Sequence, residues 1–556
     1  MRRRPLARGW LAAVAMFAVL TPGLGRAQEI SRERVARFAP DVWVTLRDFR
    51  QVTAVAAADR VAYLGTTAGV ERFDTLRGSW LAPVTEADGL PDDRVTALAA
   101  DPAGDAWIGT RRGLVRLLAF TGEIELVWGP PPARVEAVAV DPRAGDVYAR
   151  IAGGWWGGRA GANVLERLSG PPPAGLAGSV PVDALDPVDL PWTDPLYVDS
   201  PAVRGARFRL TVLDRDLRGD FYVGTWGDNG RRWGAGGQRW EPLYFGLAGP
   251  AGGPVVPTAT GYWFLPGAGA THETRTELGF DASGRVYADL DLGVPAPPAA
   301  ARASTDLASW SYVHPGRTQG LITAVAEAGL ALGDTLYLGT GYGLTQGIGE
   351  RWTHWGFADA GLGPVAALAA DGALLWLGTD HGLIAWRRSD ATPEARLLPG
   401  RRVTAVLPLS DALFVGTESG LFAGPRTGAL PDGLPRVETR GRAVRALAAR
   451  GSTVYVATDA GLEIFDRVRD DWRYALLGEG RLTAPPLALA VDAEQVWIGT
   501  ADGLVRWREA TDEWRTYYPA DGLAGAPVRH LLAEPGAVWA STPHGVSRFT
   551  WSATHE

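Results

Sequence analysis

One short phrase recurs along this chain: an aromatic residue, an aliphatic residue and then Gly-Thr, followed by a turn that carries glycine. The full copies begin at Tyr63, Trp107, Tyr222, Tyr337, Trp376, Phe414 and Trp497, near copies at Tyr455 and Trp539, and degraded copies at Tyr148 and Tyr287. A period of about 40 residues built from short strands is the signature of a radial β-repeat. The repeat therefore predicts an architecture and leaves the chemistry open.

Each repeat is predicted to be four antiparallel strands. In one clear copy, residues 95–100 alternate between apolar and small or polar side chains, as a half-buried strand does. A turn at 101–105, strands at 106–110 and 114–118, and a fourth strand that usually starts at a tryptophan complete the unit. The fourth-strand tryptophans are Trp80, Trp240, Trp310, Trp352, Trp472 and Trp514. Four strands per repeat make a propeller blade, so the predicted fold class is an all-β β-propeller.

The number of repeats sets the expected domain organisation. The glycine position of the phrase, which other residues occupy in the near and degraded copies, falls at 65, 109, 150, 224, 289, 339, 378, 416, 457, 499 and 541, which makes eleven visible units. Single rings usually have about four to eight blades. We therefore expect two rings of about six to seven four-stranded blades: an N-terminal propeller at 28–320, with irregular inserts near 168–207 and 247–275, and a C-terminal propeller at 321–556. A degraded blade around Tyr197 or Tyr262 is compatible with this division.

The two ends of the chain carry a prediction about ring closure. Residues 528–549 supply only three strands, whereas 41–46 form a lone strand with the tryptophan of a fourth strand, Trp43. A strand borrowed from the other terminus removes exposed sheet edges. The N-terminal strand closes either the last unit or the first ring, and the sequence does not separate these two wirings.

The composition indicates an exported protein. Residues 1–27 have a basic start, a short apolar run and small residues at the end, which predicts a signal peptide. Its removal deletes five arginines and no acidic residue, so the net charge moves from −7 to −12 and argues against nucleic acid as a partner. No later apolar run is long enough to span a bilayer, so we expect no stable membrane insertion. The absence of cysteine excludes disulfides and a lipid anchor on cysteine. We expect a periplasmic or secreted protein.

The repeat resembles the two-component regulator propeller repeat. The resemblance rests on an apolar-Thr-Ala-apolar strand, an Asp-Pro or Gly turn, Trp-Ile-Gly-Thr, Gly-Leu, tryptophan and Asp-Gly-Leu-Pro, and is closest at 95–116 and 487–507. It extends over most of 41–550 and is weak across 150–330. The resemblance implies periplasmic sensor propellers with carbohydrate-derived ligands, or double propellers of PorZ-type secretion machinery. Because we find no kinase, membrane helix or sorting domain after the repeats, we expect binding rather than direct signalling.

The best candidate ligand site lies in a turn that departs from the repeat. Trp226, Asp228, Asn229, Arg231, Arg232 and Trp233 combine aromatic faces, a carboxylate, an amide and guanidinium groups. This set is suited to stacking on a sugar ring and binding its hydroxyl or acid groups. Trp155 and Trp156 of the preceding unit are expected beside it, on the face formed by the loops that connect the blades. The alternative is a lengthened turn whose tryptophans pack into the blade.

Catalytic and metal signals are sparse, and we predict no metal, no cofactor and no catalytic residue. Asp183, Asp186, Asp189, Asp194 and Asp199 are compatible with calcium, but a solvated acidic loop explains them more simply. We predict a non-enzymatic propeller that binds a glycan or a protein partner. One alternative is a polysaccharide or lactone lyase that uses His272 beside Glu273. Another is an accessory scaffold of an envelope secretion machine, with an envelope protein as partner.

Overall fold

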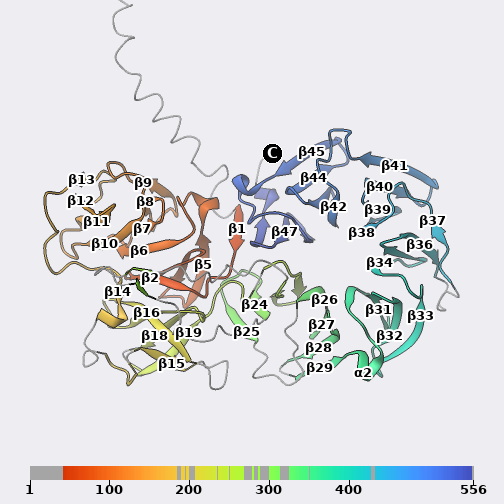
Figure 1. The fold of residues 1–556 in the computed structure, drawn as a ribbon, viewed down its shortest axis with the longest axis horizontal. Helices are drawn as coiled ribbons and strands as arrows, with labels where there is room; N and C mark the ends of the chain where they lie inside the picture. Colours follow the sequence, from red (N-terminus) through yellow and green to blue (C-terminus); the bar gives the residue numbers. More distant parts are fainter. Residues whose placement is uncertain are drawn as a thin grey trace, which may run out of the picture.

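The computed structural model describes residues 42–184, 190–194, 196–199, 207–234, 236–249, 251–267, 279–280, 286–287, 300–313, 325–349, 351–426 and 433–553. Nearly all of the regular structure is antiparallel β-sheet, arranged as small sheets around two centres (Figure 1). The helical segments in these ranges are short: α2 Phe357–Ala360, η1 Glu86–Asp88, η2 Val182–Ala184, η5 Pro519–Asp521 and η6 Trp551–Ala553. The predicted all-β propeller is confirmed.

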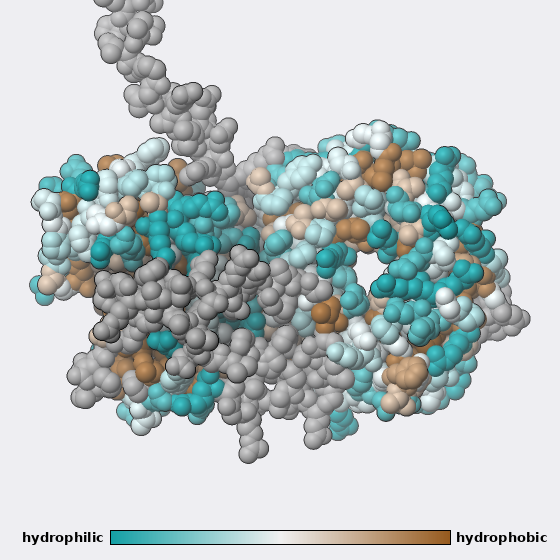
Figure 2. All heavy atoms as spheres, viewed as in Figure 1, coloured by the Kyte–Doolittle hydropathy of each residue, from teal (hydrophilic) through white to brown (hydrophobic). Residues whose placement is uncertain are grey.

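Seven four-stranded sheets form one closed ring, because the first strand of each sheet contacts the first strand of the next. Its sheets are β20 Val255–Thr258, β21 Gly261–Phe264, β24 Ala300–Ser304 and β25 Trp310–Val313; β26 Ala326–Leu332, β27 Thr335–Thr340, β28 Gly343–Ile348 and β29 Arg351–Trp355; β30 Val365–Asp371, β31 Leu374–Thr379, β32 Gly382–Arg387 and β33 Thr392–Leu397; β34 Val403–Pro408, β35 Ala412–Thr417, β36 Gly420–Pro425 and β37 Arg436–Val437; β38 Val444–Arg450, β39 Thr453–Thr458, β40 Gly461–Asp466 and β41 Asp471–Leu476; β42 Pro486–Val491, β43 Gln495–Thr500, β44 Leu504–Arg508 and β45 Glu513–Tyr517; and β46 His530–Glu534, β47 Ala537–Thr542 and β48 Gly545–Phe549 with β1 Trp43–Leu46. We call this group the seven-sheet ring, and Figure 2 shows an opening through it.

Of the two wirings that the sequence leaves open, the structure has the pairing of the two termini. β1 pairs antiparallel with β48, with Trp43 opposite Phe549 and Leu46 opposite Val546. The N-terminal strand is therefore the fourth strand of the last blade. The first strand of this blade, β46, contacts the first strands of its two neighbours, β42 and β20. The borrowed strand therefore completes the last blade of the seven-sheet ring.

Four further sheets form a second group, which we call the four-sheet unit. They are β2 Val52–Ala57, β3 Val61–Thr66, β4 Gly69–Asp74 and β5 Ser79–Val84; β6 Val95–Ala100, β7 Ala106–Thr110, β8 Gly113–Leu117 and β9 Ile124–Leu126; β10 Val135–Val140, β11 Val147–Ile151, β12 Gly154–Gly158 and β13 Glu166–Arg167; and β16 Arg207–Arg215, β17 Phe221–Thr225, β18 Gly230–Gly234 and β19 Arg239–Leu243, with β14 Val180–Pro181 and β15 Tyr197–Asp199 on β16. The first strands contact one another in the order β10, β6, β2, β16.

A crossing segment at 177–181 joins the two ends of the four-sheet unit. Ala177 exchanges two backbone hydrogen bonds with Val140 of β10, both 2.8 Å long. At its other end, β14 pairs with Val212 and Leu213 of β16. Between them, Ser179 donates its backbone N–H to Leu98 of β6, and its hydroxyl accepts the N–H of Val55 of β2. The first predicted insert is thus partly a strap across the innermost strands.

The sheets divide unequally, whereas the sequence led us to expect two rings of similar size. β20 contacts β26 and β46, so the sheet at 255–313 belongs with the seven-sheet ring. The predicted boundary at 320 falls after this sheet, and the contacts favour a boundary near 250. The sheet forms around Tyr262, whereas Tyr287 lies in β23 Val286–Tyr287, which pairs only with β22 Gly279–Phe280 in the described part of the chain. The length of the repeat gives the size of one blade but does not indicate to which ring that blade belongs.

The recurrent phrase forms the second strand of a blade and packs against the neighbouring blade. The aromatic residues Trp107, Trp376, Trp497 and Trp539 are fully buried. The indole N–H of each of them donates to an acidic residue that ends the first strand or directly follows it, as Trp107 does to Asp101 at 3.3 Å. This hydrogen bond explains why an acidic turn recurs five or six residues before the tryptophan.

The glycine of the phrase permits close approach of adjacent blades. A Cβ atom at Gly109 would lie 2.6 Å from Cγ1 and 2.7 Å from Cβ of Val135 in the next blade. We therefore expect Gly109→Ala to lower the free energy of unfolding by about 1–3 kcal/mol, as overpacked cores do. Gly341 has open space around it, and Gly341→Ala is the control. Urea denaturation of both variants checks this, and equal stabilities would contradict the inter-blade contact.

The four-sheet unit and the seven-sheet ring share one hydrophobic core. The cluster includes Phe49 and Trp80 from the first part of the chain and Phe264 and Trp539 from the ring. Phe245 lies against both Trp80 and Trp310, with ring centroids 4.8 and 5.2 Å away. A backbone hydrogen bond of 2.9 Å from Trp80 to Ala308 also crosses this junction. The two groups are therefore packed together rather than tethered by a linker.

Candidate functional site

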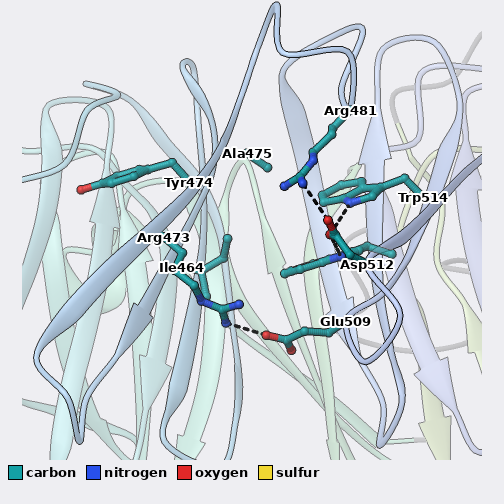
Figure 3. Close-up of a pocket in the computed structure, with 9 residues that line it drawn as sticks. Ile464, Arg473, Tyr474, Ala475, Arg481, Glu509, Asp512 and Trp514 are labelled. Atoms are coloured by element: carbon teal, nitrogen blue, oxygen red, sulfur yellow. Dashed lines mark hydrogen bonds and ion pairs between the residues drawn. The ribbon is translucent and has the colours of Figure 1, made fainter.

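A groove lies between two adjacent blades of the seven-sheet ring, on the side of the outer strands β41 and β45 (Figure 3). We call it the inter-blade groove. Its volume is about 200 Å³, and it is lined by Ile464, Arg473, Tyr474, Ala475, Arg481, Trp507, Glu509, Asp512 and Trp514. Polar, charged and aromatic groups therefore converge on a small space.

Strand alternation determines which side chains of β41 face this groove. Arg473 and Ala475 point toward the next blade, where Ala475 packs in the cluster that contains Trp507. Tyr474 points the other way in Figure 3, and Trp472 packs against the cluster of the preceding blade. Tyr474 thus contributes to the wall of the groove near its backbone, while its ring is directed elsewhere.

Two ion pairs connect the blades across the groove. Arg473 binds Glu509 at 2.6 Å, and Arg481 binds Asp512 at 2.7 Å. Glu509 also accepts the hydroxyl of Tyr455 at 2.7 Å and pairs with Arg450. Burial raises the pKa of Glu509, but the hydrogen bonds from Arg473 and Tyr455 outweigh it, so its pKa lies below the usual value. The carboxylate is ionised at neutral pH and keeps Arg473 in place.

Two stacked tryptophans form the aromatic wall. The rings of Trp507 and Trp514 have centroids 4.9 Å apart and an interplanar angle of 16°. Both indole N–H groups donate to Oδ1 of Asp512 at 3.1 Å. The hydrogen bond from Trp514 holds the pKa of Asp512 below its usual value. Trp507 is buried and Trp514 is half-buried, so the pair presents the indole of Trp514 to the groove.

The chemistry of the groove suits a small neutral polar ligand. The charged side chains that line the groove are two arginines, Arg473 and Arg481, and two acids, Glu509 and Asp512, so the lining has no net charge. The guanidinium groups of Arg473 and Arg481 keep N–H donors beyond those in the two ion pairs and can offer them to hydroxyl groups, and Trp514 offers an apolar face. The volume is below the ~300 Å³ at which sites for drug-sized ligands begin. One sugar ring fits this description.

The structure places three of the sequence-predicted site residues inside the junction of the two groups. Asp228, Asn229 and Arg231 are each at most 1% exposed. Asn229 donates to Oε1 of Glu71 at 2.9 Å, and its carbonyl oxygen accepts the hydroxyl of Tyr312 from the seven-sheet ring, also at 2.9 Å. The side chains of these three residues take part in internal contacts of the protein.

Charged groups at this junction are strongly perturbed by burial. Arg231 pairs with Asp228, and its guanidinium lies 5.5 Å from the ring centroid of Tyr244. Burial raises the pKa of Asp228 to about 6, although Arg231 and Arg50 lower it. Burial also raises the pKa of Glu71 well above its usual value. We call these residues, with Asn229 and Tyr312, the junction network.

The remaining predicted residues are not brought together into one site. Trp233 packs with Trp192 and Trp240 in the core of its blade, whereas Trp226 is half-buried. Arg232 pairs with Asp220. Trp155 and Trp156 lie on β12, in a different sheet from β18, and Figure 1 shows the two strands apart. A binding role for these residues stays a prediction.

The sequence predicted that Trp514 packs within its blade. It does stack on Trp507, but it also lines the inter-blade groove. The signal within the repeat was the charged turn at 509–513 between two tryptophans. The partners Arg473 and Arg481 come from the preceding blade, and the sequence gives no sign that they meet Glu509 and Asp512. His272, Asp186 and Asp189 lie outside the described residues, and among the described residues no group of three histidine or acidic side chains is placed to hold a metal ion.

Comparison with known proteins confirms the resemblance. Residues 89–112 match the two component regulator propeller family. No curated protein matches this chain. Among solved structures, PorZ, a surface component of the type-IX secretion system of Porphyromonas gingivalis, aligns over 92% of this chain and 87% of its own, with 12% identity and a TM-score of 0.51.

Two further structures align less closely. The extracellular domain of the putative one component system BT4673 from B. thetaiotaomicron aligns over 90% of this chain and 70% of its own, with 12% identity and a TM-score of 0.38. The WD40 β-propeller domain of Doa1 aligns over 54% of this chain and 92% of its own, with 9% identity and a TM-score of 0.39. Of these three structures, only PorZ is similar enough to support a conclusion, and at 12% identity that conclusion concerns the fold alone.

Proposed function

We propose that this chain is an exported, non-enzymatic β-propeller that binds a glycan through the inter-blade groove. The observation that carries the proposal is the convergence of the half-buried Trp514 with two inter-blade ion pairs in a groove of about 200 Å³. Stacking on an indole and hydrogen bonds to planar charged groups are what a sugar ring requires. A rigid repeat scaffold keeps these groups in place before the ligand arrives.

Export and a role outside the cytoplasm are part of the same proposal. Support comes from the basic and apolar start of the sequence and from the absence of cysteine. PorZ, which aligns over most of this chain, is described as a bacterial surface component. In the described part of the chain, the longest helices fall far short of a membrane span in length and apolar character.

Arg481 is the residue whose replacement best tests this function. Its side chain is 41% exposed and lies over Trp514, with its guanidinium 5.7 Å from the ring centroid. We expect Arg481→Ala to weaken binding of a neutral oligosaccharide by about tenfold, because a charge-assisted donor is lost without a core contact. Probes come from an array of neutral oligosaccharides, and the strongest binder is then titrated calorimetrically.

Arg469→Ala is the matched control. Arg469 is 82% exposed on the neighbouring turn of the same blade and lies outside the groove lining. Binding that is equal in Arg481→Ala, Arg469→Ala and the unmodified protein would reject the groove as the site. If no neutral saccharide binds the unmodified protein, the glycan proposal itself fails.

A further inference from the structure

A cavity of about 980 Å³ opens in the four-sheet unit, on the face opposite to the connecting loops. Its walls come from turns between first and second strands and between third and fourth strands, at 57–61, 100–105 and 214–217 among others. Ala177 and Gly178 of the crossing segment line it as well. This cavity has no contact with the inter-blade groove, and it lies on the face where the sequence predicted no site.

Most carboxylates of the wall are occupied by the protein itself, and Asp59 is the exposed exception. Asp101 accepts the backbone N–H groups of Ala103 and Asp105 at 3.0 and 3.1 Å. Asp105 pairs with Arg116 at 2.6 Å, and Asp214 accepts the N–H of Ala57 at 2.8 Å. These acids therefore stabilise their turns and have little capacity left for a ligand.

The arginines of the wall have capacity left. Arg60 and Arg77 are 64% and 70% exposed and share one carboxylate, Asp74, at 3.7 and 4.0 Å. Arg215 is exposed, with its guanidinium 5.2 Å from the ring centroid of Phe221. Each guanidinium has five N–H donors in a planar fork that matches a carboxylate. The donors left at this cavity thus favour a ligand that carries carboxylates.

Two large apolar side chains stand at the cavity without cover. Phe120, in the turn between β8 and β9, is 99% exposed, and Leu217, in the turn between β16 and β17, is 87% exposed. Single exposed apolar residues are common, but two beside a concave arginine-bearing surface have the composition of a protein interface. A polysaccharide chain gains little from an exposed leucine.

We propose that this cavity docks a segment of a protein partner that combines acidic and apolar side chains. Carboxylates of the segment bind Arg60, Arg77 and Arg215, and separate apolar side chains of the segment pack against Phe120 and against Leu217. The volume is at the upper end of the range for small-molecule sites, ~300–1,000 Å³, and so accommodates several side chains of a peptide. This protein has a net negative charge, so an acidic partner is repelled except where the arginines lie. Because salt screens the attraction to these arginines, the affinity is expected to fall as the salt concentration rises.

The test uses a display library of random peptides selected on the purified protein. We expect enriched peptides that combine aspartate or glutamate with leucine or an aromatic residue. Affinity for the best peptide is expected to fall by about tenfold or more in Ala103→Trp, which fills the cavity from an exposed wall position, and in Phe120→Asp. Phe120→Asp changes a fully exposed side chain, so it tests the site even if Ala103→Trp folds poorly.

Ala144→Trp is the matched control for Ala103→Trp. Both alanines are exposed in the turn after a first strand and donate their N–H to the aspartate that starts the turn. Failure to enrich acidic and apolar peptides, or enriched peptides that bind both tryptophan variants equally, would overturn the proposal. An oligomer of galacturonic acid is tested in parallel, and its binding here in place of peptides would identify an acidic glycan as the ligand and also overturn it.

Discussion

Replacing Trp43 with alanine is expected to lower the free energy of unfolding by about 3–5 kcal/mol, the usual cost of removing a buried tryptophan. Trp43 stacks on Phe549 with ring centroids 4.4 Å apart and an interplanar angle of 14°. It also contacts Tyr517 of the preceding blade edge to face, at 5.8 Å. Its loss therefore weakens the strand that closes the ring and the contact between the last two blades.

Chemical denaturation followed by tryptophan fluorescence measures this effect. Phe120→Ala is the control, because its side chain is 99% exposed and its removal should change stability by less than about 0.5 kcal/mol. We further expect Trp43→Ala to expose the edge of β48 and to raise the tendency to aggregate. A variant as stable as the unmodified protein would contradict closure of the seven-sheet ring by β1.

Replacing Arg231 with alanine is expected to lower the free energy of unfolding by about 3–5 kcal/mol, because it leaves the carboxylate of Asp228 buried without its ion-pair partner. Both side chains are 1% exposed and lie in the junction network. The same replacement separates a structural role from the predicted ligand-binding role. A structural residue lowers the unfolding midpoint, whereas a ligand-binding residue lowers affinity and leaves stability unchanged.

The cost of Arg231→Ala is expected to depend on pH. In the folded protein the pKa of Asp228 is about 6, above the ordinary value of 3.8, so the folded state takes up a proton before the unfolded chain does. This carboxylate therefore favours folding at low pH and loses that contribution as the pH rises through about 6. Without Arg231 the pKa of Asp228 rises further, so the variant should lose more stability at about pH 8 than at about pH 5.

Arg239→Ala is the control for this prediction, because Arg239 lies on the next strand and its side chain is 76% exposed. Denaturation curves at several pH values decide the outcome. A loss of stability that is the same at every pH would show that Arg231 acts through packing on Tyr244 rather than through its charge.

Much of the blade could be predicted from the sequence. The alternation of residues 95–100, the acidic turn that follows and the Trp-Ile-Gly-Thr strand correspond to β6 and β7. These features are local, since strand alternation and turn geometry depend on neighbouring residues. The lone strand with Trp43 also predicted pairing with a strand from elsewhere in the chain. That this partner is β48 depends on the three-dimensional path of the chain.

The candidate sites were much less predictable, because each combines residues from different blades. Arg231 is the kind of side chain that binds ligands, yet it packs on Tyr244, which stacks on Tyr312 of β25, and this packing removes it from solvent. Conversely, Trp514 occupies a repeat position that is typical of packing residues, yet together with Arg473 and Arg481 of the preceding blade it lines a groove. Burial is a property of the assembled sheets, and no local pattern records it.

The sequence by itself therefore determined the unit: four short strands, a buried aromatic residue, and a glycine that lets the next unit approach. Only the tertiary structure decided how these units group into seven and four, where the two groups meet, and which turns enclose a cavity. The physical reason is that a period arises from contacts within a blade and with its nearest neighbours. Ring size, the junction and the cavities depend on contacts between residues hundreds of positions apart, such as Trp43 and Phe549.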